Sequence, residues 1–180
     1  MNKQKTFFAL SITLIILFMA FSSRILGSVY RIAAGNRLLP LIPLIPRRCD
    51  SYGCGNFGAP RDGGARKHKG QDYISTVGQP VFTPIDGRVV STGAAYADGR
   101  YPELTLVKIQ SLSGVASFAF MYVLPVVQVG DTVTAGERIG TAQSLQARYP
   151  GIPNHVHIEL AIGGLKVDPA PFFTTSLKQA

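Results

Sequence analysis

Short runs of alternating apolar and polar residues recur between residues 80 and 162, and turns containing Gly or Asp separate them. Alternation with a period of two gives a β-strand one apolar face. The pattern predicts strands over 80–83, 87–92, 104–109, 115–124 and 155–162. Two Gly-centred turns predict a small hairpin within 125–140, and only 144–149 favours a helix. The expected class is therefore all-β and antiparallel, with any site at one face or end of a sheet.

The N-terminus has a different pattern, in which Lys3 and Lys5 precede an apolar run over 7–22 that contains no charge. A positive segment followed by an apolar one is typical of an export signal, and we expect one apolar helix here. That helix would span about 24 Å, against roughly 30 Å for the hydrocarbon core of a bilayer. A cleaved signal and a membrane anchor both remain open. Either predicts an exported protein of the cell envelope, anchored with its domain on the periplasmic or extracellular face, or secreted.

A proline-rich segment follows, with Pro40, Pro43 and Pro46 at every third position. Proline fixes φ and cannot donate a hydrogen bond, so the segment predicts an extended tether rather than a helix or an inner strand. The expected organisation has four parts: a signal or anchor over 1–24, a basic tether over 25–48, a β domain over 49–175 and a tail over 176–180.

The chain is basic, with 18 Lys and Arg against 10 Asp and Glu and a formal net charge of +8. Much of the excess lies between residues 24 and 69, which suits an anionic surface such as phospholipid headgroups or wall polymers. A solvated linker beside a membrane is the alternative. The basic residues are not interleaved with stacking aromatics, so we expect no nucleic-acid partner.

Cys49 and Cys54 are the only cysteines of the chain. In an exported protein such a pair favours a disulfide. The alternative is a pair of thiolates on a zinc ion, together with the histidines.

All three histidines of the chain fall in two short motifs. His155 and His157 are two residues apart in an alternating segment, so on a strand both imidazoles face the same side. His68 precedes Asp72 at the junction of a loop with a strand, and Gly70 between them lets the backbone bend so that both side chains converge. Two imidazoles and a carboxylate suit an open zinc site, which keeps one position for water. The alternative is a set of structural or surface histidines.

The histidine motifs resemble those of the lysostaphin-type (LytM) zinc metallopeptidases, which cut peptide cross-links in bacterial cell walls. The matching residues are His68-x-Gly70-x-Asp72 and His155-x-His157. The strand-and-turn framework of that family also recurs, in Gly78-x-x-Val81-x-x-Pro84-x-x-Gly87-x-Val89, Val129-Gly130-Asp131-x-Val133-x-x-Gly136-x-x-Ile139-Gly140 and Asp168-Pro169. The resemblance spans about residues 55–173.

A closer resemblance is to the leukocyte cell-derived chemotaxin-like branch of that family, whose vertebrate representative is regarded as a signalling ligand. It rests on Arg48-Cys49-Asp50-x-x-Gly53-Cys54-Gly55, Met121-Tyr122-Val123-Leu124-Pro125 and Leu145-Gln146-x-x-Tyr149-Pro150-Gly151-Ile152-x-x-His155-Val156-His157-Ile158-Glu159. This branch implies that Cys49 and Cys54 pair with each other.

The resemblance implies an antiparallel sheet or sandwich of the duplicated hybrid motif type, with zinc held by His68, Asp72 and His157. His155 would be the catalytic histidine, as general base or as stabiliser of the tetrahedral intermediate. Active members carry a further histidine in the strand that precedes the turn at Gly130, and this chain has none there. Tyr122 lies in that strand, and its phenol can donate the missing hydrogen bond. The alternative is that Tyr122 is a core aromatic.

Two functions are open at this point. The first is an exported zinc metalloendopeptidase that acts on peptidoglycan cross-link peptides. The second is a zinc-binding recognition module without turnover, which binds a wall component or a protein partner. The absent histidine favours the second, whereas His155 favours the first, because a structural site needs only the three ligands. Glu159 lies on the side of His157 and either orients that imidazole, forms a salt bridge or is an exposed strand residue.

Overall fold

The computed structural model of the chain describes residues 45–96 and 98–173. The predicted apolar helix within 1–24, most of the tether over 25–48 and the tail over 176–180 lie outside these residues. Within the described part, no helix has the length and apolar character needed to cross a bilayer. The limits of 49–175 for the β domain stay a prediction.

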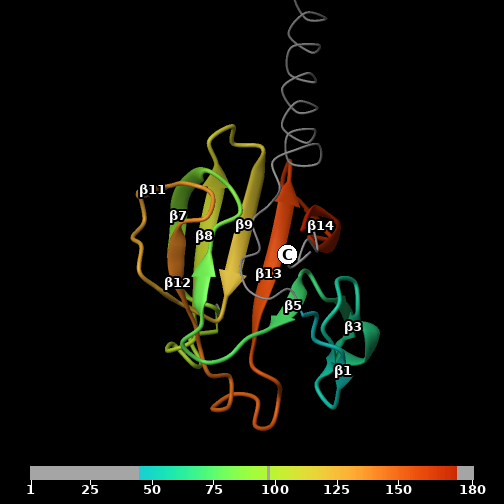
Figure 1. Cartoon of the computed structure of the whole chain (residues 1–180). Helices are drawn as coiled ribbons and strands as arrows, with labels where there is room; N and C mark the ends of the chain where they lie inside the picture. Colours follow the sequence, from blue (N-terminus) through green and yellow to red (C-terminus); the bar gives the residue numbers. More distant parts are fainter. Residues whose placement is uncertain (1–44, 97, 174–180) are drawn as a thin grey trace, which may run out of the picture. The chain divides into compact units, whose positions relative to one another are not determined.

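The main sheet has seven strands, in the order β11-β7-β8-β9-β13-β14, and β5 pairs with β13 on the edge opposite β9 (Figure 1). All of its pairings are antiparallel. The strands are β5 (Gln71–Ile74), β7 (Gly87–Ala94), β8 (Thr105–Ser111), β9 (Ala116–Met121), β11 (Thr132–Val133), β13 (His155–Ile162) and β14 (Leu165–Val167). The antiparallel, all-β class expected from the alternating pattern is confirmed.

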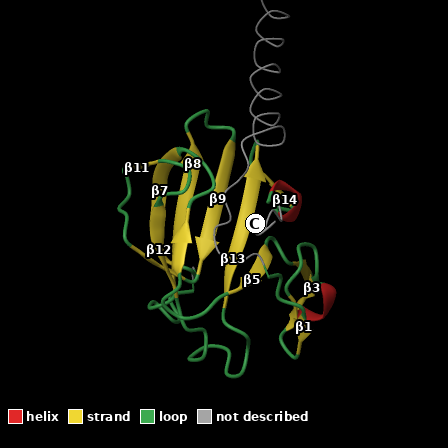
Figure 2. Cartoon of the chain, in the orientation of Figure 1, coloured by secondary structure: helices red, strands yellow, loops and turns green. Residues whose placement is uncertain are grey.

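The smaller elements surround this sheet. A three-stranded sheet has the order β10-β12-β6, and two hairpins pair β1 with β2 and β3 with β4. Their bounds are β1 (Cys49–Asp50), β2 (Gly53–Cys54), β3 (Pro60–Arg61), β4 (Arg66–Lys67), β6 (Pro80–Phe82), β10 (Val123–Pro125) and β12 (Arg138–Ala142). The helices of the described part are two short 3₁₀ turns, η1 (Asp62–Gly64) and η2 (Ala170–Phe172), as Figure 2 shows.

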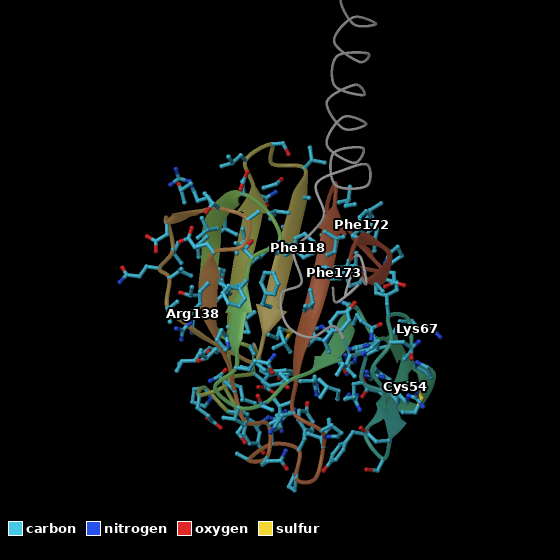
Figure 3. The ribbon with its side chains drawn as sticks, viewed as in Figure 1. Cys54, Lys67, Phe118, Arg138, Phe172 and Phe173 are labelled. Carbon is cyan, nitrogen blue, oxygen red and sulfur yellow. A yellow bond between two sulfur atoms is a disulfide. The ribbon has the colours of Figure 1, made fainter. Side chains whose placement is uncertain are left out.

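The core of the main sheet is aromatic and aliphatic. Phe118 and Phe120 of β9 are fully buried and stack at 6.0 Å between ring centroids. Phe173, which follows η2 (Figure 3), packs on Phe118 with 6.0 Å between ring centroids. It also packs on Tyr73 of β5, with 5.8 Å between centroids. Removing a buried phenylalanine typically costs about 3–5 kcal/mol. Phe173 therefore packs on both β9 and β5, which pair with opposite edges of β13.

Three local predictions are wrong. The predicted strand over 115–124 is split at Tyr122, whose φ of 68° interrupts the pleat between β9 and β10. The chain changes sheets there, because β9 pairs with β8 and β13 whereas β10 pairs with β12. Hydrogen bonds on both sides hold this backbone: Tyr122 N donates to Thr105 O at 2.8 Å, and Gln143 N donates to Tyr122 O at 2.9 Å.

The expected hairpin within 125–140 does not form, because its two strands pair elsewhere. β11 adds to β7, and β12 lies between β6 and β10. The segment 144–149 is a turn rather than a helix. Pro150 disfavours a helical conformation at the residue before it. In addition, Leu145 N donates a hydrogen bond to Asn154 Oδ1 at 2.9 Å.

Candidate metal centre

Strands β5 and β13 bring two of the expected ligands together. In their antiparallel register, Asp72 lies opposite His157 and Ile74 lies opposite His155. Residues directly opposite in such a pair project from the same face of the sheet. His68 arrives from the segment between β4 and β5, where its backbone N–H donates to Ala59 O at 2.8 Å.

The three expected ligands converge on one point. His157 Nδ1 lies 2.8 Å from Asp72 Oδ1 and 2.9 Å from His68 Nε2. His68 Nε2 lies 3.3 Å from the same carboxylate oxygen. One ligand atom from each residue falls within 4.8 Å of the others, and all three side chains are buried. Such convergence of buried polar groups is not expected of surface histidines.

Gly70 is required for this convergence because of its small size, and not because its backbone bends as the sequence predicts. Its φ is not in the left-handed region. A Cβ at this position would instead lie 2.4 Å from Ile158 O and 2.7 Å from His157 Nε2. The glycine therefore allows the segment after His68 to pass against β13.

The outer hydrogen bonds of the two imidazoles determine which nitrogens face the centre. His68 Nδ1 lies 2.9 Å from the carbonyl oxygen of Asn56, which can only accept, so this nitrogen carries the ring N–H. His157 Nε2 faces Glu159 Oε1 at 3.5 Å in the same way. The other nitrogen of each ring is directed at Asp72 Oδ1. Three electron-rich atoms meet there, and only a cation, either a proton or a metal ion, holds them together.

The charges also favour a cation at this point. Burial alone would raise the pKa of Asp72, but hydrogen bonds with His157 and His68 hold it far below its usual value. Burial would lower the pKa of His157, but Asp72 and Glu159 outweigh it and raise that pKa. An ionised carboxylate between two imidazoles is a donor set of two nitrogens and one oxygen. This set fits Zn²⁺ with an open fourth position.

His155 lies beside this triad rather than in it. Its Nδ1 lies 2.8 Å from the carbonyl oxygen of Pro153, and its Nε2 faces Asp72 Oδ2 at 3.6 Å. Burial lowers the pKa of His155, so the ring is neutral near pH 7 and its inner nitrogen is free to accept a proton. The ring packs edge-on against Tyr122, with 5.5 Å between centroids.

Glu159 takes two of the three roles left open by the sequence and is only partly exposed. It faces the outer nitrogen of His157 and also pairs with Lys166 of β14. These two partners, together, outweigh the effect of burial and lower its pKa to about 2. An ionised acceptor at this position orients the imidazole of His157.

Tyr122 ends a chain of hydroxyl groups. Its oxygen lies 2.7 Å from that of Tyr96, which lies 3.1 Å from that of Tyr149. Arg148 Nε donates to the Tyr149 hydroxyl at 3.1 Å, and its guanidinium stacks over the rings of Tyr96, Tyr101 and Tyr149 at 4.5, 4.7 and 5.1 Å. Burial raises the pKa of Tyr122 and keeps it a neutral phenol.

Sequence reasoning did not identify Tyr96 or Arg47 as part of the site. Tyr96 follows β7, far from the histidines in sequence, and no local motif marks it. The sequence marks Arg47 only as part of the basic segment, yet it is buried and its Nε lies 3.1 Å from Asp72 Oδ2. Its position two residues before Cys49 is the one signal that could have indicated it.

One cleft of about 390 Å³ joins these groups. Its lining includes the three converging ligands, His155 and the tyrosines at positions 52, 96, 122 and 149. Arg61, Asp62, Arg66 and Lys69 also line it. The cleft is large enough to admit a peptide segment beside the metal centre.

The disulfide expected between Cys49 and Cys54 is present. The residues that flank the disulfide loop both hydrogen-bond the backbone of Asp72, because Arg47 N donates to Asp72 O and Asp72 N donates to Gly55 O, both at 2.9 Å. The alternative of two thiolates on zinc is wrong.

Comparison with known families identifies the chain. Peptidase family M23 matches residues 66–169, more than half of the sequence, and the chain belongs to this family. The matched segment contains all three histidines. The expected membership of the lysostaphin-type peptidases is confirmed.

Two curated relatives support the chemotaxin-like branch. Leukocyte cell-derived chemotaxin-2 of Mus musculus is 33% identical over 113 residues, which are 63% of this chain and 71% of that protein. Myeloid protein 1 of Gallus gallus is 33% identical over 114 residues, which are 63% of this chain and 34% of that protein.

Solved structures show the same fold. The catalytic domain of lysostaphin from Staphylococcus simulans is 25% identical, covers 65% of this chain and 87% of that one, and has a TM-score of 0.53. LytU is also 25% identical, covers 65% and 80%, and has a TM-score of 0.54. A zinc-containing peptidase from Vibrio cholerae, 22% identical over 71% and 38% of the two chains with a TM-score of 0.50, shares the fold.

Proposed function

We propose that this member of peptidase family M23 is a zinc metalloendopeptidase that acts on the cross-link peptides of peptidoglycan. One observation carries the proposal: His68 Nε2, His157 Nδ1 and Asp72 Oδ1 converge inside a cleft, with the unprotonated nitrogen of a further histidine beside them. A purely structural site would need only the triad. His68, Asp72 and His157 would hold the zinc ion, which supplies Lewis-acid activation of a peptide carbonyl and of water.

His155 acts as the base. Its Nδ1–H donates to Pro153 O, which fixes the tautomer and leaves Nε2 as the acceptor directed into the site. Nε2 takes a proton from the attacking water and later delivers it to the leaving amine. The ring of Tyr122 packs against His155 and restricts its rotation.

Tyr122 donates to the oxygen that becomes negatively charged, in place of the histidine that this chain lacks. Arg148 Nε can only donate to Tyr149. If each hydroxyl then donates to the next, Tyr149 to Tyr96 and Tyr96 to Tyr122, the hydrogen of Tyr122 is left for the cleft. The positive charge of Arg148 favours this direction, because it repels hydrogens that point towards it. A donor of this kind contributes on the order of 10²–10³ in rate.

Peptidoglycan as the partner and the cell envelope as the location are inferred from the sequence and from lysostaphin, a relative named as an antimicrobial peptidase. The apolar run over 7–22 would export the chain or anchor it to the membrane. The basic tether would then keep the domain close to anionic lipid or wall polymer. Nucleic acid is not among the proposed partners.

A second function is favoured by a different observation. The chain has no histidine beyond those at positions 68, 155 and 157, so the strand that carries Tyr122 lacks the further histidine of active members. Two of its relatives are named as a chemotaxin and a myeloid protein rather than as peptidases. On this alternative the zinc centre stabilises a recognition module that binds a wall component or a protein partner without cutting it.

The deciding experiment is an assay of the zinc-loaded full-length chain on purified peptidoglycan of several cross-link types, with zinc content measured in parallel. His155→Ala is the matched control, because it removes the base and leaves the triad intact. Release of new amino termini by the parent alone would establish the peptidase. Absence of release from every cross-link type, with one zinc per chain and wall material retained in a pull-down, would establish the recognition module.

A further inference from the structure

We infer that Arg47 is a positioning residue for the metal centre, and that the loop over residues 47–55, closed by the Cys49–Cys54 disulfide, sets the centre's affinity for metal. The inference rests on the metal site of the proposed function but not on turnover. We call this segment the clasp.

The backbone of the clasp hydrogen-bonds Asp72 at two points, one at each end of the clasp. Arg47 N donates to Asp72 O, and Asp72 N donates to Gly55 O, both at 2.9 Å. Asp72 stands opposite His157, so one neighbour is β13 and the other is the clasp. Neighbouring contacts extend this edge, with Ile74 N donating to Ile45 O at 2.8 Å.

The side chain of Arg47 binds one carboxylate oxygen of Asp72 and leaves the other for the metal centre. Arg47 is 4% exposed, and its Nε holds Oδ2 at 3.1 Å. Oδ1 is left for His157 at 2.8 Å and His68 at 3.3 Å. The carboxylate is therefore held so that one oxygen is available to the metal. Outer partners that orient a ligand in this way typically contribute 10–100-fold in metal affinity.

A buried guanidinium near a cation also repels it, and the two effects must be weighed. Arg47 Nη1 pairs with Asp50 and donates to Gly53 O at 3.1 Å. The positive charge of Arg47 is thus shared by two carboxylates, which reduces its field at the metal position. Orientation remains as the larger effect, so losing Arg47 should weaken metal binding rather than strengthen it.

The disulfide fixes the acceptors on which Arg47 depends. β1 and β2 place Cys49 opposite Cys54 and Asp50 opposite Gly53, so the bond closes the hairpin that carries both partners of Nη1. Gly55 completes the packing, because a Cβ there would lie 2.5 Å from Arg47 O. The covalent closure therefore determines where the guanidinium lies, and through it the orientation of Asp72.

The test measures the zinc Kd of the full-length chain by competition with a chromophoric chelator. Arg47→Met should weaken zinc binding 10–100-fold, and Arg47→Lys, which can reach Oδ2 but not the hairpin as well, should fall between. The double variant Cys49→Ser with Cys54→Ser should show a smaller loss, and serine avoids adding thiolate ligands. Arg66→Met is the matched control, because Arg66 lines the same cleft but, among the described residues, forms its one ion pair with the exposed Asp62.

The visible spectrum of the Co²⁺-loaded chain separates positioning from general destabilisation. A change of band shape in the Arg47 variants, with a cooperative thermal transition retained, would show altered coordination. An unchanged Kd and spectrum in folded Arg47→Met, or in the double serine variant if Arg47→Met does not fold, would overturn the inference and leave the metal site standing. Absence of zinc binding by the parent chain would overturn both.

Discussion

The two walls of the cleft are built in different ways. On one side the clasp holds Asp72 through paired backbone hydrogen bonds, a disulfide and a buried ion pair. On the other side Tyr122 is held by hydroxyl groups from separate segments, with Tyr96 following β7 and Tyr149 in the turn before β13. The first wall orients a metal ligand, whereas the second orients a hydrogen-bond donor. Metal affinity and reactivity are therefore supported by different residues, and substitutions should separate them.

The largest effect is expected at the triad itself. His157→Ala removes Nδ1, the atom nearest to both other ligand atoms, and should abolish stoichiometric zinc binding. His155→Ala, two residues away on the same strand, should keep one zinc per chain and lose turnover. Atomic absorption on the dialysed chain measures both. Full zinc occupancy in His157→Ala would sink the ligand assignment, and zinc loss in His155→Ala would mean that the two roles are exchanged.

The next effect tests the tyrosine wall alone. Tyr122→Phe keeps the ring that packs on His155 and removes the donor, so kcat should fall on the order of 10²–10³. The zinc Kd should stay unchanged, because the hydroxyl group of Tyr122 is not among the ligands. Steady-state kinetics on a cross-link peptide, beside the chelator titration, give the two quantities. Equal rates for Tyr122→Phe and the parent would assign Tyr122 to packing only.

The two walls also differ in how much of each could be predicted from the sequence. The alternating segment at 155–162 and the His68 and Asp72 pair are local patterns, and both the strand and the convergence follow from them. The prediction of a hairpin over 125–140 was wrong, because the alternation of residues indicates the apolar face of a strand but not the strand with which it pairs. The role of Arg47 was missed for a similar reason: a buried ion pair across 25 residues leaves the same composition as a solvated basic linker.

The tyrosine wall was the harder part to predict. Tyr122 was identified through the missing histidine, but its left-handed backbone and its hydroxyl partners come from tertiary contacts. Tyr96 and Tyr149 pack against a small buried cluster of Tyr122, Leu104, Leu145 and Ile152, which forms only when three distant segments meet. The residue pattern within any one segment does not predict contacts between distant segments.

A smaller effect is expected one hydroxyl further from the site. Tyr96→Phe leaves the ring contacts and removes the hydrogen bond that directs the hydroxyl of Tyr122. A neutral hydrogen bond contributes about 1 kcal/mol, so kcat should fall about fivefold. KM and the zinc Kd should not change. A fall as large as that of Tyr122→Phe would indicate that Tyr96 itself contacts the substrate.

The smallest effect is expected at the start of the hydroxyl chain. Arg148→Met keeps an apolar chain over the tyrosine rings but removes the charge and the donor to Tyr149. Two intervening hydroxyl groups separate this position from Tyr122, and cooperative strengthening along such a chain is about 10–30% per bond. The expected loss in kcat is therefore about twofold or less, with Arg148→Lys closer to the parent. If Arg148→Met instead changed the zinc Kd as Arg47→Met does, the two walls would not be independent, because a residue of the tyrosine wall would be setting the orientation of Asp72.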